Sequence, residues 1–76
     1  MRELLEFLTR ALVEDPDAVE VEEFEEDGDL VYEISVAEGD LGRVIGKGGR
    51  IANAIRTIAK AAAVRIDRRV IVDILD

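Results

Sequence analysis

The sequence predicts a single α+β domain with the order helix, strand, strand, helix, helix, strand. Apolar residues recur at helical spacing over residues 2–14 and 50–64. They alternate with polar residues over 18–26 and 30–37, which is typical of strands with one buried face. A β-branched run over 69–75 adds a third strand. We therefore expect a three-stranded sheet packed against three helices, formed by residues 1–76 as one domain.

The first helix is expected over residues 2–14, RELLEFLTRALVE. Its apolar side is formed by Leu4, Leu5, Leu8, Ala11 and Leu12. Asp15-Pro16-Asp17 should end it, because the residue before a proline is disfavoured in helical conformation.

The next two segments, 18–26 and 30–37, are expected to pair as an antiparallel hairpin around Asp27-Gly28-Asp29. One face of the second strand is apolar and comprises Leu30, Tyr32, Ile34 and Val36. Phe24 is one position out of phase with Val19 and Val21, which predicts a bulge or the end of pairing near Glu23.

A short helix is expected over Leu41–Ile45, with Asp40 as its N-cap and Gly46 at its C-terminal end. A longer helix should follow from Gly49 or Arg50 to Val64. Its predicted apolar stripe is Ile51, Ile55, Ile58, Ala59 and Ala62, and its opposite face is Arg50, Asn53, Arg56, Thr57 and Lys60. The last strand is apolar on both faces over residues 70–72, a pattern that suits a well-covered strand.

Composition excludes several classes of protein. The chain contains neither cysteine nor histidine, so a disulfide scaffold and the usual zinc sites are not expected. The usual general base and thiol nucleophile are also missing, so we expect no enzyme, no cofactor and no metal. The acidic stretch EVEEFEEDGD (20–29) is interpreted as a solvated hairpin face rather than a carboxylate site. No segment is apolar enough to span a membrane and no signal peptide is evident, which predicts the cytoplasm.

Charge is divided unevenly between the two halves of the chain. Residues 1–40 carry a net charge of −13 and residues 41–76 a net charge of +5, which together give −8. The asymmetry indicates either a nucleic-acid contact by the basic half or attraction between the two halves. Three arginines before the last strand, Arg65, Arg68 and Arg69, are expected to pair with the acidic hairpin.

The stretch RVIGKGGR (43–50) places three glycines within four positions, between Arg43 and Arg50. A Walker A loop does not fit, because Gly42 and Gly46 are too close and no hydroxyl residue follows Lys47. A Rossmann fingerprint does not fit either, because a helix rather than a strand precedes the block. The G-x-x-G loop with which a KH domain clamps about four nucleotides fits residues 46–49. The alternative is a plain glycine-rich turn between two helices.

VIGKGGR (44–50) resembles the V-I-G-K-x-G-R signature of KH RNA-binding domains, and the element order matches the type II arrangement, αββααβ. The whole chain is similar to the small bacterial single-KH proteins of the KhpA family. The resembling segments are LVEDPDAVEVEE (12–23), EEDGDLVYEISV (25–36) and DLGRVIGKGGRIANAIR (40–56). One departure is Gly48, where many relatives carry glutamine or another polar residue, so a side-chain contact available to them is missing here.

The resemblance implies a single-stranded RNA-binding protein that serves as an RNA chaperone or post-transcriptional regulator. The loop would press against the RNA backbone, and the bases would lie over an apolar groove between the helices and the sheet edge. The RNA-binding residues expected on this basis are Arg43, Val44, Ile45, Gly46, Lys47, Gly48, Gly49, Arg50, Ile51 and Arg56. Core packing is the alternative role for the aliphatic members, and a plain solvated face is the alternative for Arg56 and Lys60.

The resemblance further implies a homodimer or a complex with a second KH protein similar to KhpB, and in some bacteria a link to cell-wall homeostasis and cell-length control. A second function remains open. The chain would then be a KH-like protein–protein interaction module whose acidic face binds a basic partner and whose loop is vestigial.

Overall fold

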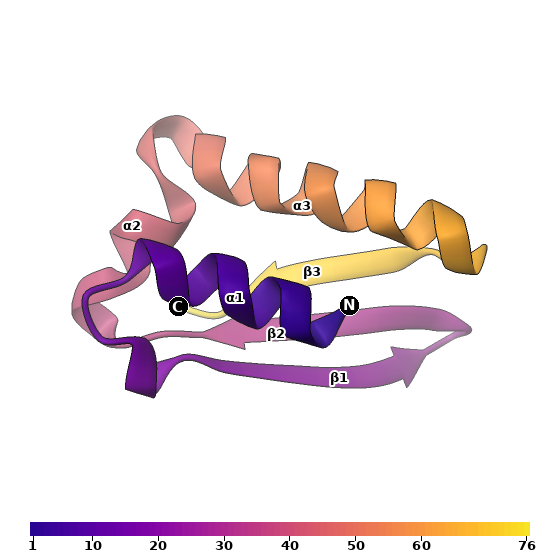
Figure 1. Cartoon of the computed structure of the whole chain (residues 1–76), viewed down its shortest axis with the longest axis horizontal. Coiled ribbons are helices and arrows are strands. Elements are labelled where there is room, and N and C mark those ends of the chain that lie inside the picture. The colour runs from indigo at the N-terminus through magenta and orange to yellow at the C-terminus, as the bar shows by residue number, and fades with distance from the viewer.

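A mixed three-stranded sheet with the strand order β1-β2-β3 forms one layer of the molecule, and the helices form the other (Figure 1). The computed structural model describes residues 1–76. The helices are α1 (Arg2–Leu12), α2 (Leu41–Ile45) and α3 (Arg50–Ala63), and the strands are β1 (Glu20–Glu26), β2 (Asp29–Ser35) and β3 (Val70–Ile74). The predicted αββααβ order and α+β class are confirmed. No helix is long and apolar enough to cross a membrane.

Helix α1 packs over the sheet, with Leu5 and Thr9 fully buried. The buried Thr9 hydroxyl donates a hydrogen bond to the Leu5 carbonyl at 2.7 Å, so its polarity is satisfied inside the helix. The helix ends at Leu12, slightly before the predicted end, and a short 3-10 turn at Pro16–Ala18 leads into β1. Proline is the first residue of this turn, a position at which the backbone N–H has no partner within the turn, so the absence of an N–H in proline costs no hydrogen bond.

Strands β1 and β2 pair antiparallel in an unbroken register from Glu20↔Ser35 to Glu26↔Asp29. The bulge predicted near Glu23 is therefore wrong. Phe24 is out of phase because it points to the other face of the sheet, away from Val21 and the core. The predicted hairpin turn is confirmed, since Asp27 and Gly28 both have positive φ, as a tight two-residue hairpin loop requires.

The core lies between the helices and one face of the sheet. Its buried residues are Leu5, Val19, Val21, Tyr32, Ile34, Val44, Ile55, Ala59, Ala63, Val70 and Val72. The predicted inward face of β2 is confirmed, because Tyr32 and Ile34 are buried and Leu30 and Val36 pack against this cluster. Burial, together with a hydrogen bond to Glu23, raises the pKa of Tyr32 to about 12.

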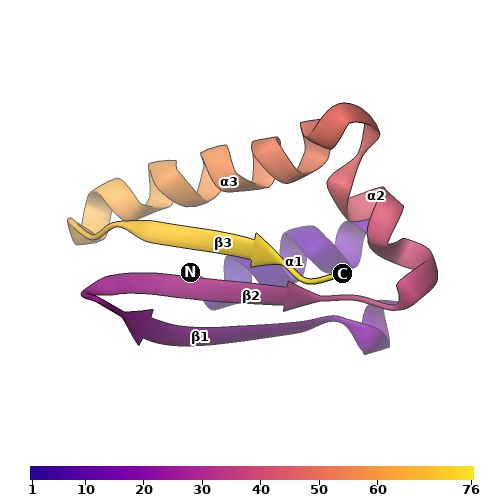
Figure 2. The ribbon, with the colours of Figure 1, turned by 180° about the vertical axis from the view of Figure 1, so that it is seen from behind.

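The predicted apolar stripe of α3 is confirmed at Ile55 and Ala59, which are buried, and at Ile51, which packs against the core, but it is wrong at Ile58, which is 40 % exposed. The buried side also includes Ala52 and Ala63. Three of the four buried residues of this helix are alanines, and periodicity alone does not reveal which of its small residues face the core. The last strand was expected to be well covered, but β3 is an edge strand that pairs only with β2, and one face of the sheet has no helix over it (Figure 2).

Candidate nucleic-acid interface

The glycine loop begins where α2 ends. Gly46 has φ 74° and ψ 171°, a backbone region that is essentially restricted to glycine. Its N–H donates to the Gly42 carbonyl at 2.9 Å and closes the helix. A Cβ at this position would lie 2.6 Å from Ile51 Cγ1 and 2.9 Å from the Ile51 nitrogen, so both conformation and space require glycine here.

The other two glycines of the loop also have positive φ, 65° at Gly48 and 79° at Gly49. The Gly49 N–H donates to the Gly46 carbonyl at 3.1 Å, which folds the loop into a tight turn before α3. Gly48 is exposed, and a Cβ built on it would have no neighbour within 4 Å. All three glycines therefore adopt a positive φ that other residues rarely adopt. The tip of the loop is open to solvent.

Cations without a carboxylate partner gather on one part of the molecule. Five of the ten form ion pairs: Arg2, Arg10, Arg43, Arg68 and Arg69. The remaining five are Lys47, Arg50, Arg56, Lys60 and Arg65. All of these lie in the loop, along α3 or directly after it, and residues 41–66 contain no acidic residue. The loop and α3 therefore carry an unneutralised positive charge suited to an anionic ligand.

The connector before β3 behaves largely as predicted. Arg68 pairs with Glu25 at 3.0 Å and also donates to the Gly28 carbonyl, and Arg69 lies 3.8 Å from Asp29. These contacts confirm the expected pairing of two arginines with the acidic hairpin. Arg65 forms no ion pair, so the expectation for this residue is wrong.

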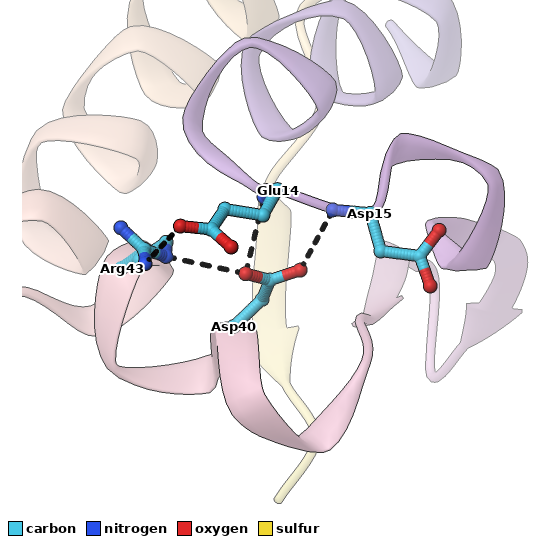
Figure 3. Close-up of polar contacts among 4 residues, drawn as sticks. All are labelled: Glu14, Asp15, Asp40 and Arg43. Carbon is cyan, nitrogen blue, oxygen red and sulfur yellow. Dashed lines mark hydrogen bonds and ion pairs between the residues drawn. The ribbon is translucent and has the colours of Figure 1, made fainter.

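Arg43 lies at the base of the loop but is engaged by acids (Figure 3). Its guanidinium is 2.6 Å from Glu14 Oε1 and 3.2 Å from Asp40 Oδ1. Asp40 in turn accepts hydrogen bonds from the backbone N–H groups of Glu14 and Asp15, at 3.1 and 3.0 Å. The structure therefore gives Arg43 a clear role in holding α2 against the end of α1.

Asp40 precedes α2 as predicted, but its carboxylate does not cap this helix. It instead binds the chain that leaves α1, so the predicted capping role is wrong. Its two backbone hydrogen bonds and the nearby Arg43 hold the pKa of the Asp40 carboxyl below its usual range. No local pattern predicts this contact, because Asp40 and its partners lie 25 and 26 positions apart along the chain.

A cleft of about 700 Å³ lies between α3 and the edge strand β3. Arg56 reaches across it and donates from Nε to the Val72 carbonyl at 3.1 Å. Arg56 therefore does not lie on the solvent face where periodicity placed it. Lys60 follows one helical turn later and also lines the cleft, together with residues 70–73 of the strand. The spacing of these two cations was the only signal in the sequence that could have revealed the cleft.

The three aliphatic residues expected to line the bottom of an RNA-binding groove differ in their burial. Val44 is fully buried and belongs to the core, while Ile45 and Ile51 are half-buried on either side of the loop. None of them lines the cleft between α3 and β3. The loop residues and Arg50 are brought together as expected, whereas Arg56 lies farther along α3 at the cleft.

An open, positively framed G-x-x-G loop between two helices, in an αββααβ fold, defines a KH domain of type II. The chain belongs to the family described as "KhpA/KhpB, KH domain", whose model matches residues 2–74.

Several relatives match along the full length of the chain. The RNA-binding protein KhpA of Caldanaerobacter subterraneus subsp. tengcongensis is 52 % identical over 75 residues, which cover 99 % of this chain and 100 % of the relative. The RNA-binding protein KhpA of Clostridium acetobutylicum is 49 % identical with the same coverage. The RNA-binding protein KhpA of Chlamydia trachomatis is 37 % identical over 76 residues, 100 % of this chain and 97 % of the relative.

Proposed function

We propose that this chain binds single-stranded RNA by seating the sugar–phosphate backbone on residues 46–49. The observation that carries the proposal is the open tip of the loop, where Gly48 leaves room for a close approach and Lys47 and Arg50 lack carboxylate partners. Backbone N–H groups of a tight turn before a helix favour an anion, and glycine admits it without a steric barrier. The names of the relatives support the same ligand class.

From the loop, the strand would follow α3 toward the cleft beside β3. Arg56 lies six residues beyond Arg50, about 9 Å along the helix axis, and Lys60 continues the same track. Phosphate contacts of this kind give affinity and position but little sequence information. The three aromatic residues, Phe7, Phe24 and Tyr32, all lie outside the loop and α3. The proposal therefore includes modest, salt-sensitive affinity rather than strong base stacking.

The proposal extends to an RNA chaperone or post-transcriptional regulator that acts by binding rather than by catalysis, in the cytoplasm where bacterial RNA is found. The relatives are named RNA-binding proteins, which supports a non-enzymatic role. A homodimer, or a complex with a second KH protein similar to KhpB, is also proposed. The family description, which joins KhpA and KhpB, supports a KH partner.

The test compares two double variants of equal charge change. Lys47→Asp/Gly48→Asp alters the loop. Arg2→Asp/Gly28→Asp, called the hairpin variant, alters the start of α1 and the turn of the hairpin. Gly28 is a matched control because it also has positive φ and no neighbour within 4 Å of an added Cβ. A labelled oligouridine of about twelve nucleotides is titrated with each protein. The loop variant should lose binding while the hairpin variant retains it, with both keeping the circular dichroism spectrum of the wild type.

Amide chemical shifts provide a second, independent measurement. On titration with the oligouridine, we expect shifts to concentrate over residues 43–51 and along α3. Equal RNA affinity of the two variants, or shifts confined to the acidic hairpin, would remove the loop from the function. The alternative of a protein–protein module with a vestigial loop predicts that residues 43–51 do not shift at all.

A further inference from the structure

The face of the sheet opposite the helices has no helix over it (Figure 2). The strand register places a row of apolar residues across this face. Phe24 pairs with Val31, and Val31 pairs with Ile71. Side chains directly opposite in a sheet share a face, and none of these three belongs to the core cluster on the helical side. Phe24 is 36 % exposed, while Val31 is only 4 % exposed beneath its neighbours. We call this row the apolar row.

Acidic residues flank the apolar row on both sides. One flanking row lies two residues away from the apolar row along the strands. In it Glu22 pairs with Glu33 and Glu33 pairs with Asp73, so this row consists of three carboxylates. On the other side, Glu26 pairs with Asp29, whose carboxylate lies 3.8 Å from the guanidinium of Arg69. Each flanking row lies about 6.6–6.8 Å from the apolar row, the rise of two residues in a strand. The apolar row is therefore bordered by three carboxylates on one side, and by Glu26 and the Asp29–Arg69 ion pair on the other.

The carboxylate row is unfavourable in the isolated chain. Like charges directly opposite on neighbouring strands destabilise a sheet, and none of Glu22, Glu33 and Asp73 has an ion-pair partner. No group of three acidic residues is placed to hold a metal ion. The carboxylates are spread at strand spacing, which suits several separate cationic side chains instead.

We propose that this face docks a basic segment of another protein in which a large apolar side chain lies between arginine or lysine residues. The apolar side chain would cover Phe24 and Ile71. The cations would pair with Glu33 and its neighbours in the carboxylate row on one side, and with Glu26, which has no ion-pair partner, on the other. Residues two apart in an extended chain, or four apart in a helix, provide the spacing of about 6–7 Å.

Charge excludes the other common occupants. RNA and anionic lipid would be repelled by the acidic rows. A symmetric pair of two copies through this face would bring the unpaired carboxylates of Glu22, Glu33 and Asp73 from both copies into one interface, which like-charge repulsion disfavours. Phe24, Val31 and Glu33 of this face lie away from the cleft beside α3, whereas Ile71 and Asp73, on the edge strand, also line that cleft.

The test uses two fluorescently labelled peptides of equal length. In one, arginine and leucine alternate at every second position with threonine between them. In the other, they are four positions apart with alanine between them. Control peptides carry glutamate in place of arginine. At least one basic peptide should bind in anisotropy titrations, with amide shifts at residues 22–24, 31–33 and 71–73, while the controls should not bind.

Three protein variants sharpen the measurement. Phe24→Ser should weaken binding by about tenfold, as loss of a central apolar anchor does. Glu33→Lys should abolish binding yet raise the melting temperature, because it relieves the like-charge row. Glu3→Lys, which makes the same charge change on α1, should bind within about twofold of the wild type, since a remote surface charge contributes little.

The proposal is overturned if neither basic peptide binds, if Glu33→Lys and Glu3→Lys bind equally, or if the shifts lie elsewhere. Concentration-dependent shifts of the same residues without peptide would show that a second copy of the chain occupies this face, and would overturn it as well. Because Phe24 and Glu33 lie outside the glycine loop, these outcomes are separate from those of the RNA experiment.

Discussion

The guanidinium of Arg43 lies 3.2 Å from the carboxylate of Asp40, one turn earlier in the chain, and this pair joins the start of α2 to the end of α1. Asp40 is nearly buried, and it binds two backbone N–H groups beyond α1. The contact fixes the helix from which the glycine loop emerges. Residues outside the loop therefore determine where the loop is held.

Stability should depend on the charge of Asp40. Because its pKa is lower in the folded chain than its ordinary value of 3.8, folding favours the ionised form. This stabilisation is present in full above the ordinary value and is lost as the pH falls below it. Urea unfolding across the acidic range should show a steeper loss of stability for the wild type than for Asp40→Asn. Asp15→Asn is the control, and it should retain the slope of the wild type.

Tyr32 should resist ionisation until the chain unfolds. Its pKa is raised to about 12, so the folded state favours the protonated phenol, and the associated stability is lost as the pH rises from the ordinary value of 10.0. Since the chain has one tyrosine and no tryptophan, its ultraviolet absorbance reports this group alone. Glu23→Gln should lower the midpoint of the titration. A midpoint near 10 with the fold intact would contradict the buried placement.

The glycines of the loop should differ in their tolerance of alanine. Gly46→Ala should lower the free energy of unfolding by about 3 kcal/mol, because it combines a glycine-only conformation with a collision against Ile51. Gly48→Ala should cost only about 1 kcal/mol, since its φ of 65° is left-handed but the space is open. Urea denaturation measures both. Gly28→Ala, also left-handed and open, should match Gly48→Ala rather than Gly46→Ala.

Substitutions of Arg43 and Lys47 should have different effects, one on stability and the other on RNA affinity. Lys47→Met should weaken RNA binding by about three- to fivefold, the effect of one solvent-exposed charge contact, with stability unchanged. Arg43→Met should instead lower the melting temperature, because Asp40 and Glu14 lose their partner. The comparison requires RNA titration and thermal unfolding of both variants. An RNA defect of Arg43→Met as large as that of Lys47→Met would show that this arginine leaves its acids to contact RNA.

The slope of RNA affinity against salt concentration should report how many unpaired cations contact the RNA. Four of them, Lys47, Arg50, Arg56 and Lys60, lie on the proposed path, which predicts a slope of about −3 in a plot of log affinity against log salt. Replacing Arg56 or Lys60 by methionine should each flatten the slope by about 0.7. Arg65→Met removes an unpaired cation that does not line the cleft, so it should leave the slope unchanged. A common slope for all these proteins would place the RNA elsewhere.

Local chemistry explains most of what the sequence revealed about the fold. The alternation of Tyr32 and Ile34 and the Asp27-Gly28 turn are governed by near neighbours, and both appear in the structure as expected. The first helix ends at Leu12, slightly before the predicted stop at Asp15-Pro16. The predictions for Ile58, for Phe24 and for the covering of the last strand are wrong. Which stripe of a helix is buried, and whether an out-of-phase residue marks a bulge or a second face, depend on partners that are remote along the chain.

The same distinction applies to the candidate site. The positive φ angles that require glycine at positions 46, 48 and 49 are a local property of the backbone, so the spacing of these glycines predicted the loop. The engagement of Arg43 by Glu14 crosses 29 positions, and that of Arg56 by Val72 crosses 16. Neither contact is signalled by neighbouring residues. Arg43 and Arg56 were therefore both predicted to bind RNA, together with the loop residues.

The separation of charge between the sheet and α3 has a kinetic consequence. A molecule with acids on one flank and uncompensated cations on another possesses a large electric dipole, and the field of a polyanion exerts a torque on it during approach. Rotation before contact raises the fraction of collisions that become complexes, so added salt should slow association more than it hastens dissociation. The acidic half of the chain would then govern how fast RNA is captured without ever touching it.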